Sequence, residues 1–396
     1  MRSWLRKSAL ACATISLLAG SPVAAQTAAP QPAIALIDAA DRPQVESWAN
    51  KKGWRVIAPM AATGNIDTRV QGLETAVLEA TKSGSADPAR IYMVGRGGSV
   101  AAVFYAISRV PDLWAAAVAL GGSPQPAIDS DRLFTGNFAN VPVLWLSAGP
   151  QDQALASRLK SGGMNLEWRG GEAFEVETIL DWLAGHTRAE YPGAIDCETN
   201  SPTFARCYWI LMTRFDAAER NDVLPSSRLQ ATSIAALDLG GFGYKPDDSG
   251  PGVLVSTLPD KYSGPLKVGD RIVALDGREI ADPRRYSDLM AQIKEQRAAV
   301  VLVQRGKDRM RIETSIVLPK RAPVVTARVQ AQYLPEDHEI QIVSRAVTQM
   351  RVTVPRQWVP AVLNWNGVPL EKLDAPGCRL LTIEKALQNA AACPEQ

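Results

Sequence analysis

The chain has 396 residues with 43 basic and 41 acidic side chains, a formal net charge of +2, and a hydrophobic fraction of 46%. This length predicts two or three domains with sizeable cores, and the near-neutral charge argues against nucleic acid as a partner, because phosphate binding needs clustered Lys and Arg. Only two histidines occur, His186 and His338. Two histidines are too few for a histidine-rich metal site, and a Ser-His-Asp triad would have to use one of the two. We expect no metal or cofactor.

The first 25 residues have the features of a secretory signal peptide. Three basic residues stand among the first seven, residues 9–18 are apolar, and small residues precede a cleavage point near Ala25. The apolar run is too short to span a bilayer, and no later stretch has eighteen unbroken apolar residues. We therefore expect a periplasmic or secreted protein that does not span a membrane.

Beyond this signal the sequence has four cysteines in two close pairs, Cys197 with Cys207 and Cys378 with Cys393. In an oxidising compartment this arrangement predicts two disulfides, each stabilising the fold by about 2–3 kcal/mol on the chain-entropy model. Four unpaired buried thiols are the alternative. A zinc site is disfavoured because neither pair has C-x-x-C spacing and no histidine is near.

Residues 33–190 alternate short apolar runs with amphipathic segments. We expect strands at 33–37, 54–59, 91–95, 115–120 and 141–147, and helices at 44–52, 68–82, 99–109 and 176–184. Continuous apolar strands separated by helices indicate a parallel sheet covered on both faces.

This region resembles the α/β-hydrolases, in particular secreted esterases of the poly(3-hydroxybutyrate) depolymerase and feruloyl esterase kind. The similar stretches are residues 47–59, 87–95, 111–116 and 142–146, in the family's order. The family's nucleophile stands in a G-x-S-x-G turn between a strand and a helix. Here that turn reads Gly95-Arg96-Gly97-Gly98-Ser99, so the nucleophile position is Gly97, which has no side chain. Ser99 takes the place of the second glycine, where we expect its hydroxyl to cap the following helix.

The remaining catalytic positions are also altered. The resemblance places the acid at Asp152, in the loop after the fifth strand, and the base in the loop at 168–174, which has Glu172 and no histidine. His186 ends the final helix, where a surface or capping role is expected. The oxyanion loop becomes Asp38-Ala39, whose negative charge would oppose a developing oxyanion. These changes predict a degenerate triad without hydrolysis by the family's route.

An active serine hydrolase, an esterase or a peptidase, remains the alternative. It would use Ser99 or Ser123 with Asp152 or Glu172. Ser123 follows the strand at 115–120, at the edge of the sheet where catalytic residues are expected.

From about residue 231 the pattern changes to short strands with Gly, Pro and Asp turns. We expect strands at 252–256 and 266–277, an amphipathic helix at 284–295, and a hairpin of 300–307 with 311–318.

This order resembles a PDZ domain of the bacterial secreted-protease type, on the motifs at 267–272, 276–280 and 305–307. The resemblance implies that an extended polypeptide adds as a strand beside the helix, with main-chain amides holding its terminal carboxylate. The carboxylate loop would be Leu239, Gly240, Gly241, Phe242 and Gly243, with Arg285 and Leu289 flanking the groove on the helix. The alternative is a PDZ fold used as a spacer, its groove filled by its own chain.

The remaining segments are rich in β-strand patterns. Residues 206–211 look like one strand, and further strands are expected at 324–333, 339–343, 350–354 and 362–367. This tail is similar to the small β-sandwich that the family's secreted esterases can carry. If both segments belong to one sandwich, the PDZ domain is inserted within it. Trp358 and Trp365 are expected in its core.

The sequence thus predicts an α/β fold, an α/β-hydrolase-like parallel sheet with helices on both faces, joined to a PDZ domain and a small β-sandwich-like region. The expected domains are a signal peptide (1–25), an α/β-hydrolase-like domain (33–190), a linker with a possible strand (191–230), a PDZ domain (231–320) and a β-rich C-terminal domain (321–396). The expected function is non-catalytic binding of polypeptide C-termini or extended strands. A serine hydrolase, or a chaperone-like accessory of a periplasmic assembly, are the alternatives.

Overall fold

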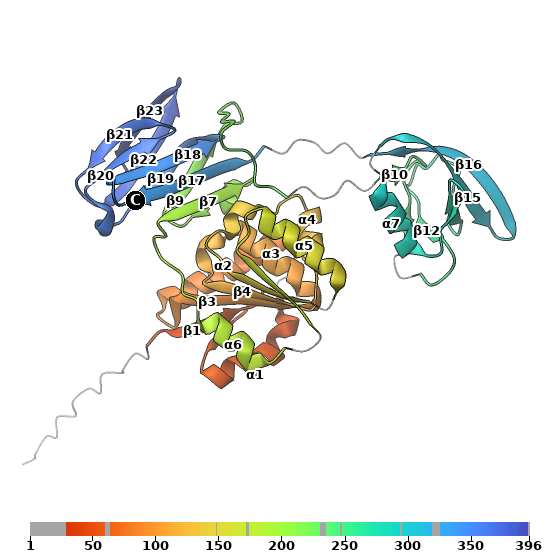
Figure 1. The fold of residues 1–396 in the computed structure, drawn as a ribbon, viewed down its shortest axis with the longest axis horizontal. Helices are drawn as coiled ribbons and strands as arrows, with labels where there is room; N and C mark the ends of the chain where they lie inside the picture. Colours follow the sequence, from red (N-terminus) through yellow and green to blue (C-terminus); the bar gives the residue numbers. More distant parts are fainter. Residues whose placement is uncertain are drawn as a thin grey trace, which may run out of the picture.

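The computed structural model describes residues 29–59, 64–147, 149–171, 174–229, 235–245, 248–293, 295–318 and 325–394. The expected signal peptide lies outside these residues. Within them no helix is long and apolar enough to cross a membrane. Three units follow from the strand pairing: an α/β unit, a β-sandwich, and a unit inserted between two strands of the sandwich (Figure 1).

The α/β unit is built on one parallel sheet with the order β2-β1-β3-β4-β5-β6. Its strands are β1 (Gln31–Ala35), β2 (Arg55–Ile57), β3 (Ala86–Arg96), β4 (Ala116–Leu120), β5 (Val143–Ser147) and β6 (Leu166–Gly170). The chain builds outward from β1 to β2 and then crosses back to β3. The topological switch point, where ligands of open α/β sheets bind, therefore lies beyond the carboxyl ends of β1 and β3.

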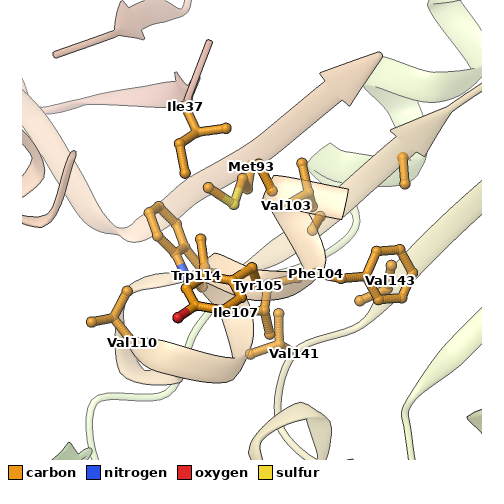
Figure 2. Close-up of a cluster of buried hydrophobic side chains, with 14 of the residues drawn as sticks. Ile37, Met93, Val103, Phe104, Tyr105, Ile107, Val110, Trp114, Val141 and Val143 are labelled. Carbon is orange, nitrogen blue, oxygen red and sulfur yellow. The ribbon is translucent and has the colours of Figure 1, made fainter. Parts of the chain in front are cut away.

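Helices cover both faces of this sheet, because side chains alternate along each strand. On one face α1 (Arg42–Lys52) and α6 (Val176–Ala184) pack over Ile34 and Leu36. On the other face α2 (Ile66–Lys82), α3 (Val100–Arg109) and α5 (Pro150–Ser161) pack into a second core that includes Ala33 and Ala35 of β1 and Val143 of β5. Figure 2 shows part of this second core, where Phe104 of α3 lies beside Val143 of β5. The predicted parallel sheet with helices on both faces is confirmed.

The α/β unit holds elements that the sequence reading left out. A short helix α4 (Gln125–Asp129) follows β4, and α5 replaces the expected loop around Asp152. Pro150 explains this second error, because proline suits the first position of a helix, where its missing N–H is not needed. Trp168–Gly170, expected in a loop, belongs to β6.

The β-sandwich joins segments from both sides of the inserted unit. One sheet has the order β21-β20-β18-β17-β7, and the other β23-β22-β19-β9-β8. The first segment supplies β7 (Ala194–Thr199), β8 (Arg206–Cys207) and β9 (Ile210–Phe215). The second supplies β17 (Ala327–Leu334), β18 (Glu339–Arg345), β19 (Val347–Val354), β20 (Ala361–Trp365), β21 (Val368–Leu373), β22 (Gly377–Glu384) and β23 (Leu387–Ala392).

The core of the sandwich explains several sequence features. Trp358 and Trp365 are buried in it, as expected. Both predicted disulfides are present: Cys197–Cys207 ties β7 of one sheet to β8 of the other, and Cys378–Cys393 ties β22 to the residue after β23. Residues 206–211 are not the single strand expected: β8 ends at Cys207, the chain turns at Tyr208, which has a left-handed φ of 51°, and β9 begins at Ile210.

The inserted unit is a small sheet with one main helix. Its strands β10 (Ala236–Leu237), β11 (Gly243–Tyr244), β12 (Val253–Thr257), β13 (Arg271–Leu275), β15 (Arg297–Arg305) and β16 (Asp308–Val317) lie in the order β10-β16-β15-β13-β12-β11, and β14 (Arg278–Glu279) pairs with β13. Helix α7 (Pro283–Gln292) packs on the core of this unit. Residues 266–270, expected to extend β13, form a turn instead. Asp270 holds that turn by accepting hydrogen bonds from the Lys267 amide (2.7 Å) and the Arg305 guanidinium (2.7 Å).

Candidate functional site

The first candidate site lies at the switch point of the parallel sheet. There β3 ends at Arg96, the short turn η2 (Gly97–Ser99) follows, and α3 begins at Val100. Gly97 has a left-handed φ of 51°, and a Cβ atom added there would have no heavy atom within 4 Å. The backbone therefore makes the sharp strand-to-helix turn that exposes a nucleophile in hydrolases, but the residue at its tip has no side chain.

Ser99 is 7% exposed and its hydroxyl is fully engaged. The oxygen accepts a hydrogen bond from the Arg96 amide (2.7 Å) and lies 2.6 Å from Asp41 Oδ2 and 2.8 Å from the Arg96 carbonyl oxygen. Its single proton can serve only one of these acceptors at a time. The expected cap of α3 is wrong, since Ser99 makes no side-chain hydrogen bond to that helix and instead closes the turn before it.

Among the other proposed catalytic residues, Ser123 lies next to this turn, because a Cβ atom added to its neighbour Gly122 would meet the Gly97 carbonyl group, but no catalytic hydrogen bond to it is formed within the described residues. Asp152 lies in the first turn of α5, and Ser123 accepts a hydrogen bond from the Gln125 amide (3.2 Å). His186 caps the end of α6 through Nδ1, 2.7 Å from the Trp182 carbonyl oxygen. Glu172 lies outside the described residues. Within the described part of the chain, no hydrogen bond joins Ser99 or Ser123 to Asp152 or to a histidine.

The loop after β1 is short and contains the negatively charged Asp38. Asp38 caps the short turn η1 (Ala39–Asp41) by accepting a hydrogen bond from the Ala40 amide (3.0 Å), and the chain then enters α1. Sequence reasoning missed Asp41, the partner of Ser99. A signal was present, because Asp41 follows β1 and Ser99 follows β3, and the carboxyl ends of neighbouring parallel strands meet at one edge of a sheet.

The second candidate site is in the inserted unit, at the glycine-rich loop before β11. Gly240 and Gly241 both have φ of 80°, a conformation that side-chain-bearing residues rarely adopt. Tyr262 supports the loop: its hydroxyl donates to the Leu239 carbonyl oxygen (2.6 Å) and accepts from the Leu266 amide (3.1 Å). Within the described residues, the amides of Gly240, Gly241 and Phe242 donate no hydrogen bond.

A cavity of about 300 Å³ lies beside this loop, between β11 and α7. Aromatic and aliphatic side chains dominate its walls, which are formed by Ala235, Ala236, Leu237, Gly241, Phe242, Tyr244, Tyr286, Ser287 and Met290. The Tyr244 and Ser287 hydroxyls lie 3.2 Å apart and connect β11 with α7. Burial raises the pKa of the Tyr286 phenol above its usual range.

The two residues of α7 that we expected beside the groove, Arg285 and Leu289, do not line this cavity. Leu289 is 4% exposed and packs into the core of the unit. Arg285 is exposed and lines a separate polar hollow together with Asp282 and Asp288. The helix turns Tyr286, Ser287 and Met290 toward the cavity instead. A pattern of apolar spacing gives the buried stripe of a helix, but it does not say which part of that stripe borders a groove.

No arrangement for a metal is found in the described ranges, because no group of three His, Cys, Asp or Glu side chains lies close enough together to hold one.

Comparison with solved structures finds esterases. A thermostable esterase has 15% identity and a TM-score of 0.31, with 40% of this chain and 56% of that chain covered. Esterase 2 of Thermogutta terrifontis, phosphoramylated by tabun, has 14% identity and a TM-score of 0.32 over 41% of this chain and 86% of its own. A bacterial heroin esterase has 14% identity and a TM-score of 0.28, with coverage of 37% and 67%. No family model matches the chain, and no curated protein matches its sequence.

Proposed function

We propose that this chain is an exported, non-catalytic binding protein whose inserted unit acts as a PDZ-like domain and binds a polypeptide by its C-terminus. One observation carries the proposal: the consecutive amides of Gly240, Gly241 and Phe242 donate no hydrogen bond within the described residues, and Gly241 and Phe242 line a cavity of about 300 Å³. Successive amides in a turn of this kind form a concave site for an anion.

The strand next to this loop supplies the second requirement for peptide binding. Among the described residues, β11 is the last strand of its sheet and pairs with β12 alone. An extended peptide can therefore add beside β11, with its backbone bonded to the strand, its carboxylate on the loop amides, and its last side chain in the cavity. The aromatic walls from Phe242, Tyr244 and Tyr286 favour an apolar last side chain.

The α/β unit serves in this proposal as a scaffold. Its switch point has a glycine where a nucleophile would stand, and the nearby Ser99 hydroxyl is bonded to Asp41 and Arg96. The two disulfides, and the sequence of the first 25 residues, support export to the periplasm or to the medium, where disulfides persist.

Peptide titration tests the binding site directly. Peptides selected from a library with randomised free C-termini are compared with the same peptides carrying amidated ends. We expect amidation to weaken binding at least about ten-fold, equal to about 1.4 kcal/mol. Equal affinity of the two forms, or no selected peptide, would contradict carboxylate binding.

Two variants of α7 locate the binding site. Ser287→Arg places a large side chain in the cavity, whereas Asp288→Arg puts the same side chain on the neighbouring residue, which lines the other hollow. We expect the first variant to abolish peptide binding and the second to leave it within about two-fold of the parent. Equal effects of both would place the peptide elsewhere.

A serine hydrolase is the second candidate, and two contacts favour it. Ser99 Oγ lies 2.6 Å from a carboxylate, and within the described residues the exposed amides of Gly97 and Gly98 donate no hydrogen bond, so they could stabilise an oxyanion. A fluorophosphonate probe decides between the candidates. Our proposal predicts no labelling, and stoichiometric labelling that Ser99→Ala abolishes would establish a hydrolase.

A further inference from the structure

The four edge strands of the β-sandwich differ in how they are protected from pairing with other chains. An exposed edge offers unpaired N–H and C=O groups, and proteins usually block it with proline, charge, short length or a covering segment. β21 carries Pro369 and the charged pair Glu371 and Lys372. β8 has only two residues, and the neighbouring Tyr208 hydroxyl is bonded to the Pro111 carbonyl oxygen.

The edge of β7 is covered by the α/β unit. The Asn137 side chain accepts a hydrogen bond from the Glu198 amide (2.7 Å) and donates to the Glu198 carbonyl oxygen (3.0 Å), so it occupies the positions that another strand would take. Asn140 donates to the Ala194 carbonyl oxygen (2.8 Å) in the same way. Three of the four edges are thus blocked.

β23 has neither charge nor proline, and although it lies near β21 of the facing sheet, the two strands are not paired within the described residues. It pairs on one side with β22 over six residues, from Leu387 opposite Glu384 to Ala392 opposite Arg379. Its sequence, Leu-Gln-Asn-Ala-Ala-Ala, contains no charge and no proline, and Leu387 is 70% exposed. Within the described residues, no backbone hydrogen bond outside the pairing with β22 involves this strand. Figure 1 places β23 at the outer end of the sandwich, away from the α/β unit.

We propose that β23 pairs with β23 of a second copy of this chain across a two-fold axis, which extends the five-stranded sheet into a ten-stranded one. Antiparallel strands place directly opposite residues on the same face of a sheet. We expect the register in which the two-fold axis passes through Asn389, so that the exposed faces of the two strands lie on the same side of the sheet. In this register Leu387 lies opposite Ala391 of the second copy. Asn389 then meets its own equivalent at the axis.

Two properties of the strand favour a second copy over a foreign chain. Because β23 has no charge, self-pairing brings no like charges together, although it would do so in a strand such as β21. The side chains that face each other also differ in size, because the large, exposed Leu387 of one copy lies opposite the small Ala391 of the other. Such a self-complementary patch is what a two-fold interface requires.

The contact is small, so we expect a reversible dimer with a Kd between about 10 µM and 1 mM. Sedimentation velocity over a range of protein concentrations measures it. Asn389→Lys puts two like charges at the axis and should leave only monomer. Val368→Lys is the matched control, because Val368 is an exposed residue of the blocked edge strand β21. A chain that stays monomeric at all concentrations would overturn the proposal, as would equal effects of the two variants.

Crosslinking tests the register. Asn389→Cys should form a disulfide with its own equivalent under mild oxidation. Ala391→Cys alone should form none, but it should crosslink when mixed with Leu387→Cys. The four cysteines beyond the expected signal peptide do not interfere, because they form the two disulfides of the fold. Crosslinking of Ala391→Cys to itself, without crosslinking of Asn389→Cys, would show a different pairing and refute this one.

Discussion

Glu198 is the group whose removal should most disturb the connection between the sandwich and the inserted unit. It lies on β7 and is 0% exposed. Its carboxylate accepts hydrogen bonds from the Ser226 hydroxyl (2.5 Å), the Ser227 amide (2.5 Å), the Thr326 hydroxyl and the Arg345 guanidinium (2.9 Å). Ser226 and Ser227 precede the inserted unit and Thr326 follows it. One carboxylate therefore fixes both connections to that unit.

The loss of stability on removing this carboxylate can be estimated from the buried groups that lose their hydrogen-bond acceptor. Glu198→Ala leaves the Arg345 guanidinium, whose side chain is only 18% exposed, without its carboxylate partner. It also removes the acceptor of four further donors, which are the Ser226 hydroxyl, the Ser227 amide and hydroxyl, and the Thr326 hydroxyl. Removing one partner of a buried ion pair destabilises a protein by about 3–5 kcal/mol. Such a change lowers the folding equilibrium constant of the sandwich by about 10²- to 10⁴-fold.

Hydrogen–deuterium exchange followed by mass spectrometry is the appropriate assay, because it reports stability segment by segment. We expect Glu198→Ala to speed exchange in the segments around Ser227 and Arg328 and in the strands of the sandwich. Asp374→Ala is the control: its ion pair with Lys372 is about three-quarters exposed, and such pairs contribute at most about 1 kcal/mol. If Glu198→Ala exchanges like this control, the carboxylate does not hold the two connections together.

Three further predictions concern the α/β unit and the disulfides. Burial raises the pKa of Asp112 to about 6 although Arg206 lies 2.8 Å away, so the folded protein binds a proton at this carboxyl more tightly than the unfolded chain does. The resulting stabilisation is full below about pH 4 and is lost as the pH rises through 6. In denaturant titrations, the unfolding free energy of the parent relative to Asp112→Asn should fall by about 2–3 kcal/mol from pH 4 to pH 7, and a constant difference would refute the shift. Gly97→Ser has room for its side chain and should destabilise the fold by only about 1 kcal/mol. It should remain unlabelled by a fluorophosphonate, because the carboxylate at this turn, Asp41, is already hydrogen-bonded to Ser99; labelling would show that only the nucleophile was missing. Replacing Cys378 and Cys393 by serine opens a loop with a sequence separation of 15 and should cost about 3 kcal/mol, seen as a lower denaturation midpoint; an unchanged midpoint would mean that this disulfide adds nothing to the fold.

The sequence allowed the parallel sheet to be predicted because its signals are local. Continuous apolar runs mark buried strands, and the bounds expected for the last helix of the unit agree with α6 (Val176–Ala184). The predictions failed where distant segments decide the outcome. The partner of Ser99 is Asp41, which is 58 residues away, and only the neighbouring positions of β1 and β3 bring the two together. In α7 the PDZ resemblance pointed to Arg285 and Leu289 as groove residues, whereas the cavity is bordered by Tyr286, Ser287 and Met290.

The two candidate sites both present backbone amides, but they differ in the side chains and strand edges beside these amides. Both present consecutive amides without a partner among the described residues: Gly97 and Gly98 at the switch point, and Gly240 to Phe242 in the inserted unit. Hydrolysis needs more than such amides, since a nucleophile and a base must stand beside them, and here Gly97 has no side chain and Ser99 is bonded to Asp41. Binding of a carboxylate needs only the amides, an adjacent strand edge and a cavity. The inserted unit has all three, and this is the physical reason for assigning recognition to that unit and a supporting role to the parallel sheet.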